Sequence, residues 1–160
     1  MTEANAIAAA GELAVKHLKK EKKLSDTVCA ACVRALATIG GDIALDVLEG
    51  YADDTREIVL TELVKAWEMF NRDIYAMRIL SQTFRNKTSV RLERISSLEG
   101  IQYLTNLSIL DVSGCSQLSD LTPLAGLTNL STLDVSDCNQ LTTITLTSLA
   151  NLSMLNLKRE

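Results

Sequence analysis

Two cysteines separated by two residues, Cys29 and Cys32 in the stretch CAAC, have a spacing that could support chemistry. Such a pair can form a redox-active disulfide or supply two of the four ligands of a zinc site. The sequence holds no second pair of this kind, and its single histidine is not placed to complete a zinc site. The residues 31 positions later are Leu60 and Leu63, so a buried structural role is the favoured interpretation. A redox or metal pair is the alternative.

The remaining candidates for catalysis or ligand binding are interpreted as structural. His17 aligns with Val47 and lacks a Ser, Cys or Asp at a spacing that would make it a catalytic base, so we expect it to line a helix face at the edge of the core. Trp67 occupies the position of Leu36, which favours the core over an interface. The basic run KHLKKEKK favours a solvated turn over a phosphate site. We therefore expect no enzyme activity, no catalytic residue, no cofactor and no metal.

Length and charge argue against several classes of protein. A chain of 160 residues has room for one domain or for two small modules that share a core. The net charge of −4 argues against a general nucleic-acid binder, which needs a basic surface. No apolar run reaches the ~18 residues of a membrane helix, and the start of the chain lacks the pattern of a secretion signal. We therefore expect a cytoplasmic location, reduced cysteines, and neither a nucleic acid nor a membrane as partner.

The C-terminal half repeats its apolar residues at a nearly constant step. Leu110 recurs as Leu133 and Val112 as Val135 after 23 residues, and a step of 22 then leads to Leu155. The shared pattern, L-x-x-L-x-L/V-x-x-C-x-x-L, is that of a leucine-rich repeat. Each repeat supplies one strand and one return segment, and only stacking in register buries its leucines. We expect a parallel sheet in which these residues form columns of the core.

Other positions of this half follow from the same repeat. Val90 and Leu92 predict an abbreviated first strand that caps the stack. Pro123 is expected to open a short helical or 3₁₀ turn, where its missing N–H costs little. Cys115 and Cys138 should lie one strand spacing apart. A disulfide between them is conceivable, but reduced, buried thiols are favoured.

The N-terminal half repeats with a different period. The stretch VCAACVRALATI at 28–39 aligns with VLTELVKAWEMF at 59–70 after 31 residues, and GELAVKHL at 11–18 resembles GDIALDVL at 41–48 after 30. Apolar spacings of three and four residues mark amphipathic helices. Pairs of helices that recur at this period predict HEAT-like repeats.

Capping residues are expected to mark the ends of these helices. Gly40 and Gly41 should end the helix that contains the CAAC stretch. Asp54 with Glu57 should form a capping box at the next long helix. Asn71 should start the last helix, RDIYAMRIL.

The predicted fold is an α+β solenoid in two parts. Residues 1–84 should form all-α HEAT-like helical repeats, and residues 85–160 a short leucine-rich-repeat solenoid with a parallel β-sheet. The second part should comprise a capping strand and about three repeats. The helical period stops, and strand-like sequence begins, within residues 81–90. A solenoid needs a polar cap at each end, and the untidy ends of this chain lead us to expect a piece of a longer protein.

The predicted protein-binding surface is the concave face of this sheet. In a leucine-rich strand, the residues that alternate with the buried ones point to that face. They are Arg91, Ile109, Asp111, Ser113, Thr132, Asp134, Ser136, Met154 and Asn156, with Glu93 and Lys158 at the margins. Asp111 beside Asp134 should form an acidic pair whose spare acceptors favour a basic group on a partner. The alternative is that small polar residues merely keep the sheet soluble.

The stretch LVKAWEMFNRDIYAMRIL at 63–80 is followed directly by leucine-rich repeats such as DLTPLAGLTNLSTLDVSDC. This arrangement resembles the C-terminal part of bacterial STAND-class NTPases with a NACHT module, which are relatives of the animal NOD-like receptors. The resemblance implies a region that recognises a ligand, often a foreign protein, and releases the NTPase module; bacterial members are associated with antiphage defence. The chain lacks G-x-x-x-x-G-K-S/T, so any phosphate-binding loop would lie outside it, and no catalytic residue is carried over.

Two functions are compatible with these observations. The first is a non-catalytic protein–protein recognition module for sensing a protein ligand, as the C-terminal sensor part of a bacterial NACHT/STAND defence NTPase. The second is a structural adaptor or autoinhibitory arm. Such an arm would dock on the NTPase module of its own larger parent protein and bind no foreign ligand.

Overall fold

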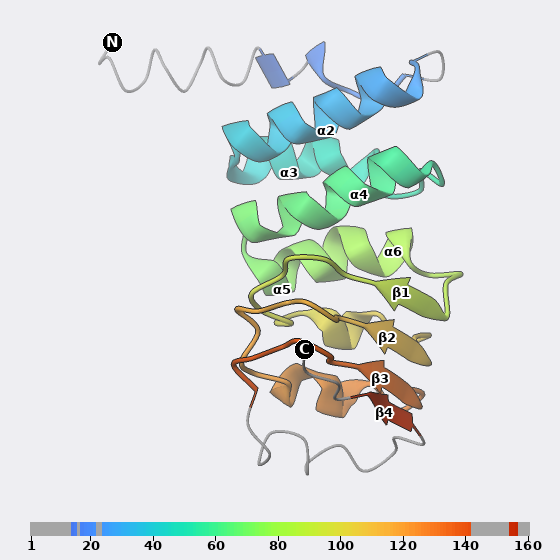
Figure 1. Ribbon diagram of the computed structural model, residues 1–160. Coiled ribbons are helices and arrows are strands. Elements are labelled where there is room, and N and C mark those ends of the chain that lie inside the picture. Colours follow the sequence, from blue (N-terminus) through green and yellow to red (C-terminus); the bar gives the residue numbers. More distant parts are fainter. Residues whose placement is uncertain (1–13, 16, 22–23, 142–153, 157–160) are drawn as a thin grey trace. The chain divides into compact units, whose positions relative to one another are not determined.

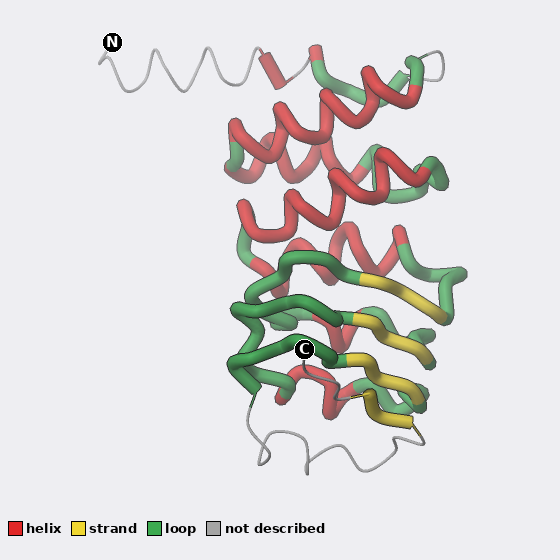
Figure 2. Tube along the Cα trace, in the orientation of Figure 1, coloured by secondary structure: helices red, strands yellow, loops and turns green. Residues whose placement is uncertain are grey.

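A computed structural model of the chain describes residues 14–15, 17–21, 24–141 and 154–156. Within these residues, helices come first and four short strands follow (Figures 1 and 2). This α+β content agrees with the prediction. Two compact units, Met1–Thr83 and Phe84–Glu160, divide the chain.

The N-terminal unit is built from helices. Its described elements are α2 (Asp26–Ile39), α3 (Gly41–Glu49), α4 (Glu57–Ala66), the 3₁₀ turn η1 (Trp67–Met69), α5 (Arg72–Tyr75), the π-helical segment η2 (Ala76–Leu80) and α6 (Ser81–Thr83). α2 packs on both α3 and α4, and α3 packs on η2. In Figure 1, α2 and α4 form one layer, and α3 lies with α5 and α6 in the layer behind.

Two predicted helix ends are confirmed. Gly40 ends α2 with a left-handed φ of 68°, and its N–H donates to the carbonyl of Leu36. A residue with a Cβ is disfavoured in this conformation, which explains the glycine. Asn71 begins α5, where its side-chain oxygen accepts from the N–H of Ile74 at 3.0 Å.

The buried residues of α2 and α4 are related by 30 positions, and not by the predicted 31. They pair as Cys29 with Val59, Ala30 with Leu60, Val33 with Leu63, Leu36 with Ala66 and Ala37 with Trp67. A shift of one residue turns a side chain by ~100° around the helix axis. Val28, which the sequence paired with Val59, is accordingly 44% exposed.

Individual side chains of this unit follow the prediction in part. Trp67 is fully buried, as predicted, and its indole N–H donates to the carbonyl of Arg72 at 2.8 Å. Cys29 is also buried, whereas Cys32 is only partly buried. His17 is exposed, so the expectation that it lines the edge of the core is wrong. Val47, with which it was aligned, is itself only partly buried, so this position lies at the margin of the helix face.

The predicted capping box of Asp54 and Glu57 is wrong. Arg56 is the N-cap of α4, and no side chain caps this helix. Asp54 instead accepts hydrogen bonds from the backbone N–H of Arg56 at 3.0 Å and from its guanidinium at 2.9 and 2.6 Å. The Nζ atom of Lys20 lies 3.4 Å from the same carboxylate. Because Asp54 is only 6% exposed, its charge requires these positive partners.

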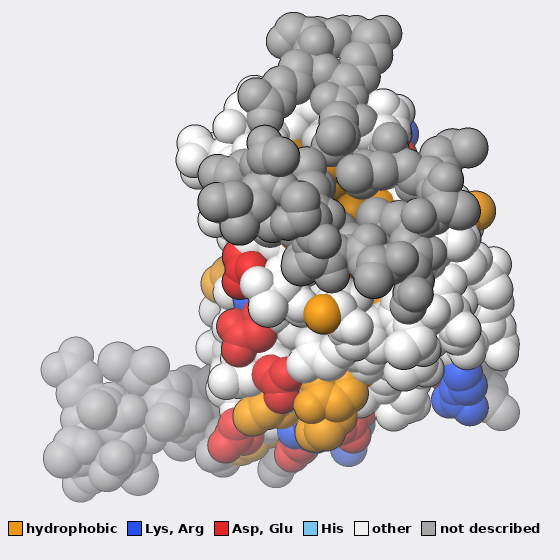
Figure 3. Space-filling model, turned by 90° about the horizontal axis from the view of Figure 1, so that it is seen from below, with side chains coloured by type: hydrophobic (Ala, Val, Ile, Leu, Met, Phe, Trp, Pro, Cys, Tyr) orange, Lys and Arg blue, Asp and Glu red, His pale blue; other side chains and the backbone are white. Residues whose placement is uncertain are grey.

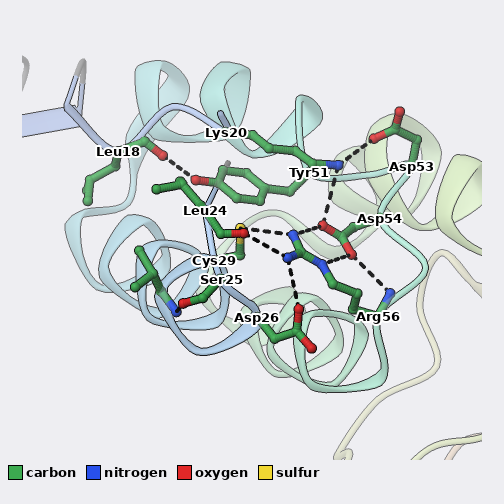
Figure 4. Close-up of polar contacts among 11 residues, drawn as sticks. Leu18, Lys20, Leu24, Ser25, Asp26, Cys29, Tyr51, Asp53, Asp54 and Arg56 are labelled. Carbon is green, nitrogen blue, oxygen red and sulfur yellow. Dashed lines mark hydrogen bonds and ion pairs between the residues drawn. The ribbon is translucent and has the colours of Figure 1, made fainter. Parts of the chain in front are cut away.

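Arg56 ties the loop before α4 to the beginning of α2 (Figure 4). Its guanidinium donates to the carbonyl of Leu24 at 3.1 Å, to the carboxylate of Asp26 at 3.0 Å and to the sulfur of Cys29 at 2.9 Å. One side chain thereby joins segments about 30 residues apart in the sequence, matching the repeat period. We call Asp26, Cys29, Asp54 and Arg56 the Arg56 cluster.

The C-terminal unit contains a parallel sheet whose strands follow one another in chain order. Its elements are β1 (Ser89–Arg91), the 3₁₀ turn η3 (Ile101–Tyr103), β2 (Ile109–Asp111), the 3₁₀ turn η4 (Thr122–Gly126), β3 (Thr132–Asp134) and β4 (Met154–Asn156), with the order β1-β2-β3-β4. Leu110 pairs with Leu133, and Leu133 with Leu155, so the predicted register is confirmed. Pro123 lies at the start of η4, as predicted.

The core of this unit consists of aliphatic columns and two thiols. Leu110, Leu133 and Val112 are 0% exposed, and Val135 is 3% exposed. Cys115 and Cys138 are buried free thiols, as predicted. The sulfur of Cys115 donates to the carbonyl of Leu92 at 3.4 Å, and that of Cys138 to the carbonyl of Val112 at 3.1 Å. Each thiol therefore satisfies a carbonyl of the preceding coil, and burial raises the pKa of both.

Replacing Leu133 by alanine tests the column of the sheet. Leu133→Ala should lower the free energy of unfolding by about 2–5 kcal/mol, because the emptied space lies between two neighbouring strands and cannot collapse fully. Urea unfolding followed by circular dichroism measures this loss. Ile109→Ala is the matched control, since Ile109 lies on a neighbouring strand and is 42% exposed. It should cost less than about 1 kcal/mol, and equal losses would contradict the column.

The pH dependence of stability tests the Arg56 cluster. Hydrogen bonds from the Arg56 guanidinium lower the pKa of Asp54 from 3.8 to about 2 and outweigh the opposing effect of burial. A carboxyl whose pKa is lower in the folded state contributes stability above its unfolded pKa, and this contribution is lost as the pH falls through the folded pKa. The free energy of unfolding should therefore drop less steeply between about pH 5 and about pH 2 in Asp54→Asn than in the wild type.

Trp67 fluorescence during urea unfolding is a suitable measurement, because this side chain is buried in the same unit. Asp53→Asn is the matched control. Asp53 also pairs with Lys20, but its side chain is 80% exposed. The control should keep the wild-type slope, and an Asp54→Asn slope equal to that of the wild type would contradict the role of the cluster.

Candidate protein-binding surface

The strands β1, β2 and β3 each bury their middle residue and leave its two neighbours more exposed. Val90, Leu110 and Leu133 are buried, whereas Ser89, Arg91 and Ile109 are exposed. The cause is the alternation of side chains along an extended chain. We call the outward side of β1–β4 the open face.

Parallel pairing brings the predicted surface residues into rows that cross the strands. The first row is Ser89, Ile109, Thr132 and Met154, and the second row is Arg91, Asp111, Asp134 and Asn156. Ser113 and Ser136 follow two residues after the aspartates and are partly buried. The side chain of Met154 and all of Lys158 lie outside the described residues. The sequence thus placed the described residues of the surface on one face, but it did not reveal their contacts.

The second row, which we call the charged row, has donors at both ends and two carboxylates in the middle. The Nε atom of Arg91 lies 3.9 Å from Asp111 Oδ2 and 3.5 Å from Glu93 Oε1. At the other end, the side-chain amide of Asn156 donates to Asp134 Oδ2 at 3.2 Å. Asp111 and Asp134 are direct register partners, so their like charges face each other between these donors.

Both aspartates also shape the turn that follows their strand. Asp111 Oδ1 accepts from the backbone N–H of Ser113 at 2.9 Å, and Asp134 Oδ1 does the same from Ser136 at 2.9 Å. The Ser136 hydroxyl donates to Asp134 as well. The expectation of freely available acceptors therefore needs correction, because one oxygen of each carboxylate already serves its own coil. The repeated D-V-S spacing is the sequence signal of such an Asx turn, and it was missed.

The environment of Asp134 favours its charged form. Burial by itself would raise the pKa of Asp134, but hydrogen bonds from Ser136 and Asn156 and the positive charge of Arg91 outweigh it and leave this pKa below its ordinary value. A carboxylate held in this way remains negative at neutral pH. The centre of the open face therefore presents negative charge beside the exposed apolar side chain of Ile109.

Other kinds of site find little support in the described part of the chain. Those residues contain no group of three or more His, Cys, Asp or Glu side chains that could hold a metal ion. No described helix is long and apolar enough to cross a membrane. In the view of Figure 3, acidic side chains gather on one side of the visible surface, while the lysine and arginine side chains that it shows form no continuous patch.

Comparison with known proteins yields one match. The model of a family described as the leucine-rich-repeat (LRR) domain of endo-beta-N-acetylglucosaminidase EndoS matches residues 71–159, more than half of the chain. The chain belongs to this LRR family. No curated protein and no solved structure matches it. The matched part of this LRR chain begins at Asn71, the N-cap of α5, and includes the four described strands.

The comparisons confirm the leucine-rich repeat and leave the finer identification open. The predicted repeat lies within the matched range. The NTPase parent that the sequence resemblance implies is not identified by any comparison. The matched family takes its name from an endoglycosidase, and the model that matches is that of its LRR domain.

Removing a donor of the charged row should change the titration of Asp134. Asn156→Ala deletes the side-chain amide that binds Asp134 Oδ2, so the pKa of Asp134 should rise towards its ordinary value. Carboxylate carbon chemical shifts in an NMR pH titration measure this change directly. Asp120 is the internal control, because its lowered pKa comes from Thr122 and should stay constant. An unchanged Asp134 titration would contradict the contact.

Proposed function

We propose that the open face is a protein-recognition surface and that the chain is a non-catalytic sensing module. The observation that supports this proposal most strongly is the charged row, which lies beside the exposed side chain of Ile109. Parallel pairing holds the strands that carry these residues in place. LRR domains typically mediate protein interactions, and exposed residues on a rigid sheet suit that role. The nine predicted residues, from Arg91 to Asn156, form the proposed contact area.

The charges of the open face favour a partner segment with a basic side chain. Asp111 and Asp134 each keep an oxygen directed along the charged row, where a lysine or arginine of the partner would reduce their mutual repulsion. An apolar partner residue beside it would cover Ile109, which is 42% exposed. Arg91 at the margin would then disfavour a second basic group and so fix the direction of the partner.

The larger context of the module is also a proposal. We assign the chain to the C-terminal sensor part of a bacterial NACHT/STAND defence NTPase, which the stretch at 63–80 supports by resemblance. The match to a domain of an endo-beta-N-acetylglucosaminidase supports a glycosidase as the second possible parent. In either parent this part would recognise a protein and leave the chemistry to another domain.

The architecture of the proposal has two parts. Residues 1–84 would form HEAT-like repeats, which the 30-residue recurrence of buried positions between α2 and α4 supports. Residues 85–160 would form the leucine-rich solenoid. The alternative function is an autoinhibitory arm whose open face docks on another domain of its own parent protein. The sensing module and the autoinhibitory arm would use the same surface. The sensor would bind a foreign protein, whereas the arm would bind another domain of its own parent protein.

Selection of peptides tests the proposed surface. A displayed library of random peptides, selected on the wild-type chain at low salt, should enrich sequences that place lysine or arginine next to an apolar residue. The variant carrying Asp111→Lys and Asp134→Lys should bind the enriched peptides at least about tenfold more weakly, because attraction becomes repulsion. Fluorescence polarisation measures the affinities. Added salt should weaken wild-type binding.

The matched control carries Glu99→Lys and Asp120→Lys, which change the net charge equally. Both residues are exposed and lie outside the strands of the open face. This control should bind like the wild type, and equal binding by both double variants would overturn the proposed surface. If the only ligand found is another domain of the parent protein, the autoinhibitory arm replaces the sensor.

A further inference from the structure

The two cysteines of the CAAC stretch differ in exposure. Cys29 is 0% exposed, whereas Cys32, three residues further along α2, is partly exposed. Residues three apart on a helix lie on the same side, with Cβ atoms about 5–6 Å apart. A small reagent in solution therefore reaches Cys32 first, and Cys29 lies next to whatever forms there.

The sulfur of Cys29 has a cationic donor. Arg56 Nη2 donates to it at 2.9 Å, and the same guanidinium is held by Asp54 and Asp26 (Figure 4). A thiol attacks a disulfide as its thiolate, and a neighbouring guanidinium stabilises that negative charge. Cys29 also lies in the first turn of α2, where the helix dipole acts in the same direction.

Cys32 is connected to the same region through Tyr51. Burial raises the pKa of Tyr51, and a side-chain hydrogen bond with Cys32 raises it further, so the phenol stays protonated. The Tyr51 hydroxyl donates to the carbonyl of Leu18 at 2.5 Å.

We propose that Cys29 and Cys32 form a thiol–disulfide modification site for a low-molecular-weight disulfide, with Cys32 as the entry residue and Cys29 as the resolving residue. The Cys32 thiolate attacks one sulfur of the small disulfide, whose S–S bond breaks and releases one thiolate. The Cys29 thiolate then attacks the Cys32 sulfur, the Cys29–Cys32 bond forms, and the second small thiolate leaves. Two electrons pass from the cysteine pair to the reagent, and the two protons pass through water to the released thiolates.

Closure of the disulfide requires a small movement in α2. Cβ atoms must approach to about 3.5–4.5 Å, so the turn from Cys29 to Cys32 must tighten by about 1–2 Å. The turn before it is capped by Ser25, whose Oγ lies 3.4 Å from the N–H of Val28. Oxidation also draws the sulfur that accepts from Arg56 into the new disulfide. The modification therefore loosens the contact by which Arg56 ties the loop before α4 to α2.

Treatment of the full chain with glutathione disulfide tests the site. Trypsin cleaves after Lys23 and Arg34, so one peptide, LSDTVCAACVR, contains both cysteines. Mass spectrometry should find this peptide two hydrogens lighter, without a lasting glutathione adduct. Dithiothreitol should restore the original mass. The tryptic peptide 95–158, which contains both Cys115 and Cys138, should stay unmodified, because both thiols are buried and have raised pKa values.

Variants separate the two roles. Cys29→Ser should accumulate the glutathione adduct on Cys32, and Cys29→Ala serves the same purpose if the serine variant does not fold. Cys32→Ser should react at least about tenfold more slowly, because Cys29 is inaccessible. Arg56→Gln should slow the conversion of adduct to disulfide. Arg78→Gln is its control, since Arg78 also forms two ion pairs, with Glu49 and Asp46, in the same unit.

Clear outcomes would overturn the proposal. A wild-type adduct that persists as long as in Cys29→Ser would show that Cys29 does not resolve it. A Cys32→Ser variant that reacts at the wild-type rate would show that Cys32 is not the entry residue. Equal conversion rates in Arg56→Gln and Arg78→Gln would remove Arg56 from the mechanism.

Discussion

In-register stacking of aliphatic side chains is the constraint on which the C-terminal unit depends. Leu110 pairs with Leu133 and Leu133 with Leu155, and a three-residue strand offers no other way to bury its middle side chain. A shift of one residue would turn every leucine outward. The stacking also fixes which side chains face away from the core. The register that buries the leucines therefore also determines which side chains make up the open face.

Under the proposed function, Asp111 and Asp134 serve both structure and recognition. One carboxylate oxygen of Asp111 and one of Asp134 accept a hydrogen bond from the turn that follows their strand. The second oxygen of each carboxylate lies along the charged row. Arg91 and Asn156 limit the cost of placing two like charges side by side. For the proposed partner, side chains that are already held by such contacts would lose little entropy on binding.

The helical unit is held by a different combination of forces. Apolar faces of α2 and α4 pack together, while Arg56 and the buried carboxylate of Asp54 join the loop before α4 to the beginning of α2. The ion pair fixes a specific geometry, since a buried charge is stable only when its partners lie at the right places. The sulfur of Cys29 belongs to this network, which gives a cysteine at an apolar position a polar neighbour.

The sequence by itself determined the repeat, the strand register and the buried thiols of the C-terminal unit, because a leucine-rich repeat encodes each core position with the same residue type. It also determined Gly40 and Asn71 as helix ends, since those depend on local backbone chemistry. Only the tertiary structure decided the 30-residue register of α2 and α4, the partners of Asp54 and the contacts of the charged row. Where alanines and small apolar residues abound, the apolar pattern of a helix fits two alignments that differ by one residue, so it does not fix the register. The contacts of Asp54 and of the charged row join side chains that are distant in sequence, and these meet only after packing has brought them together.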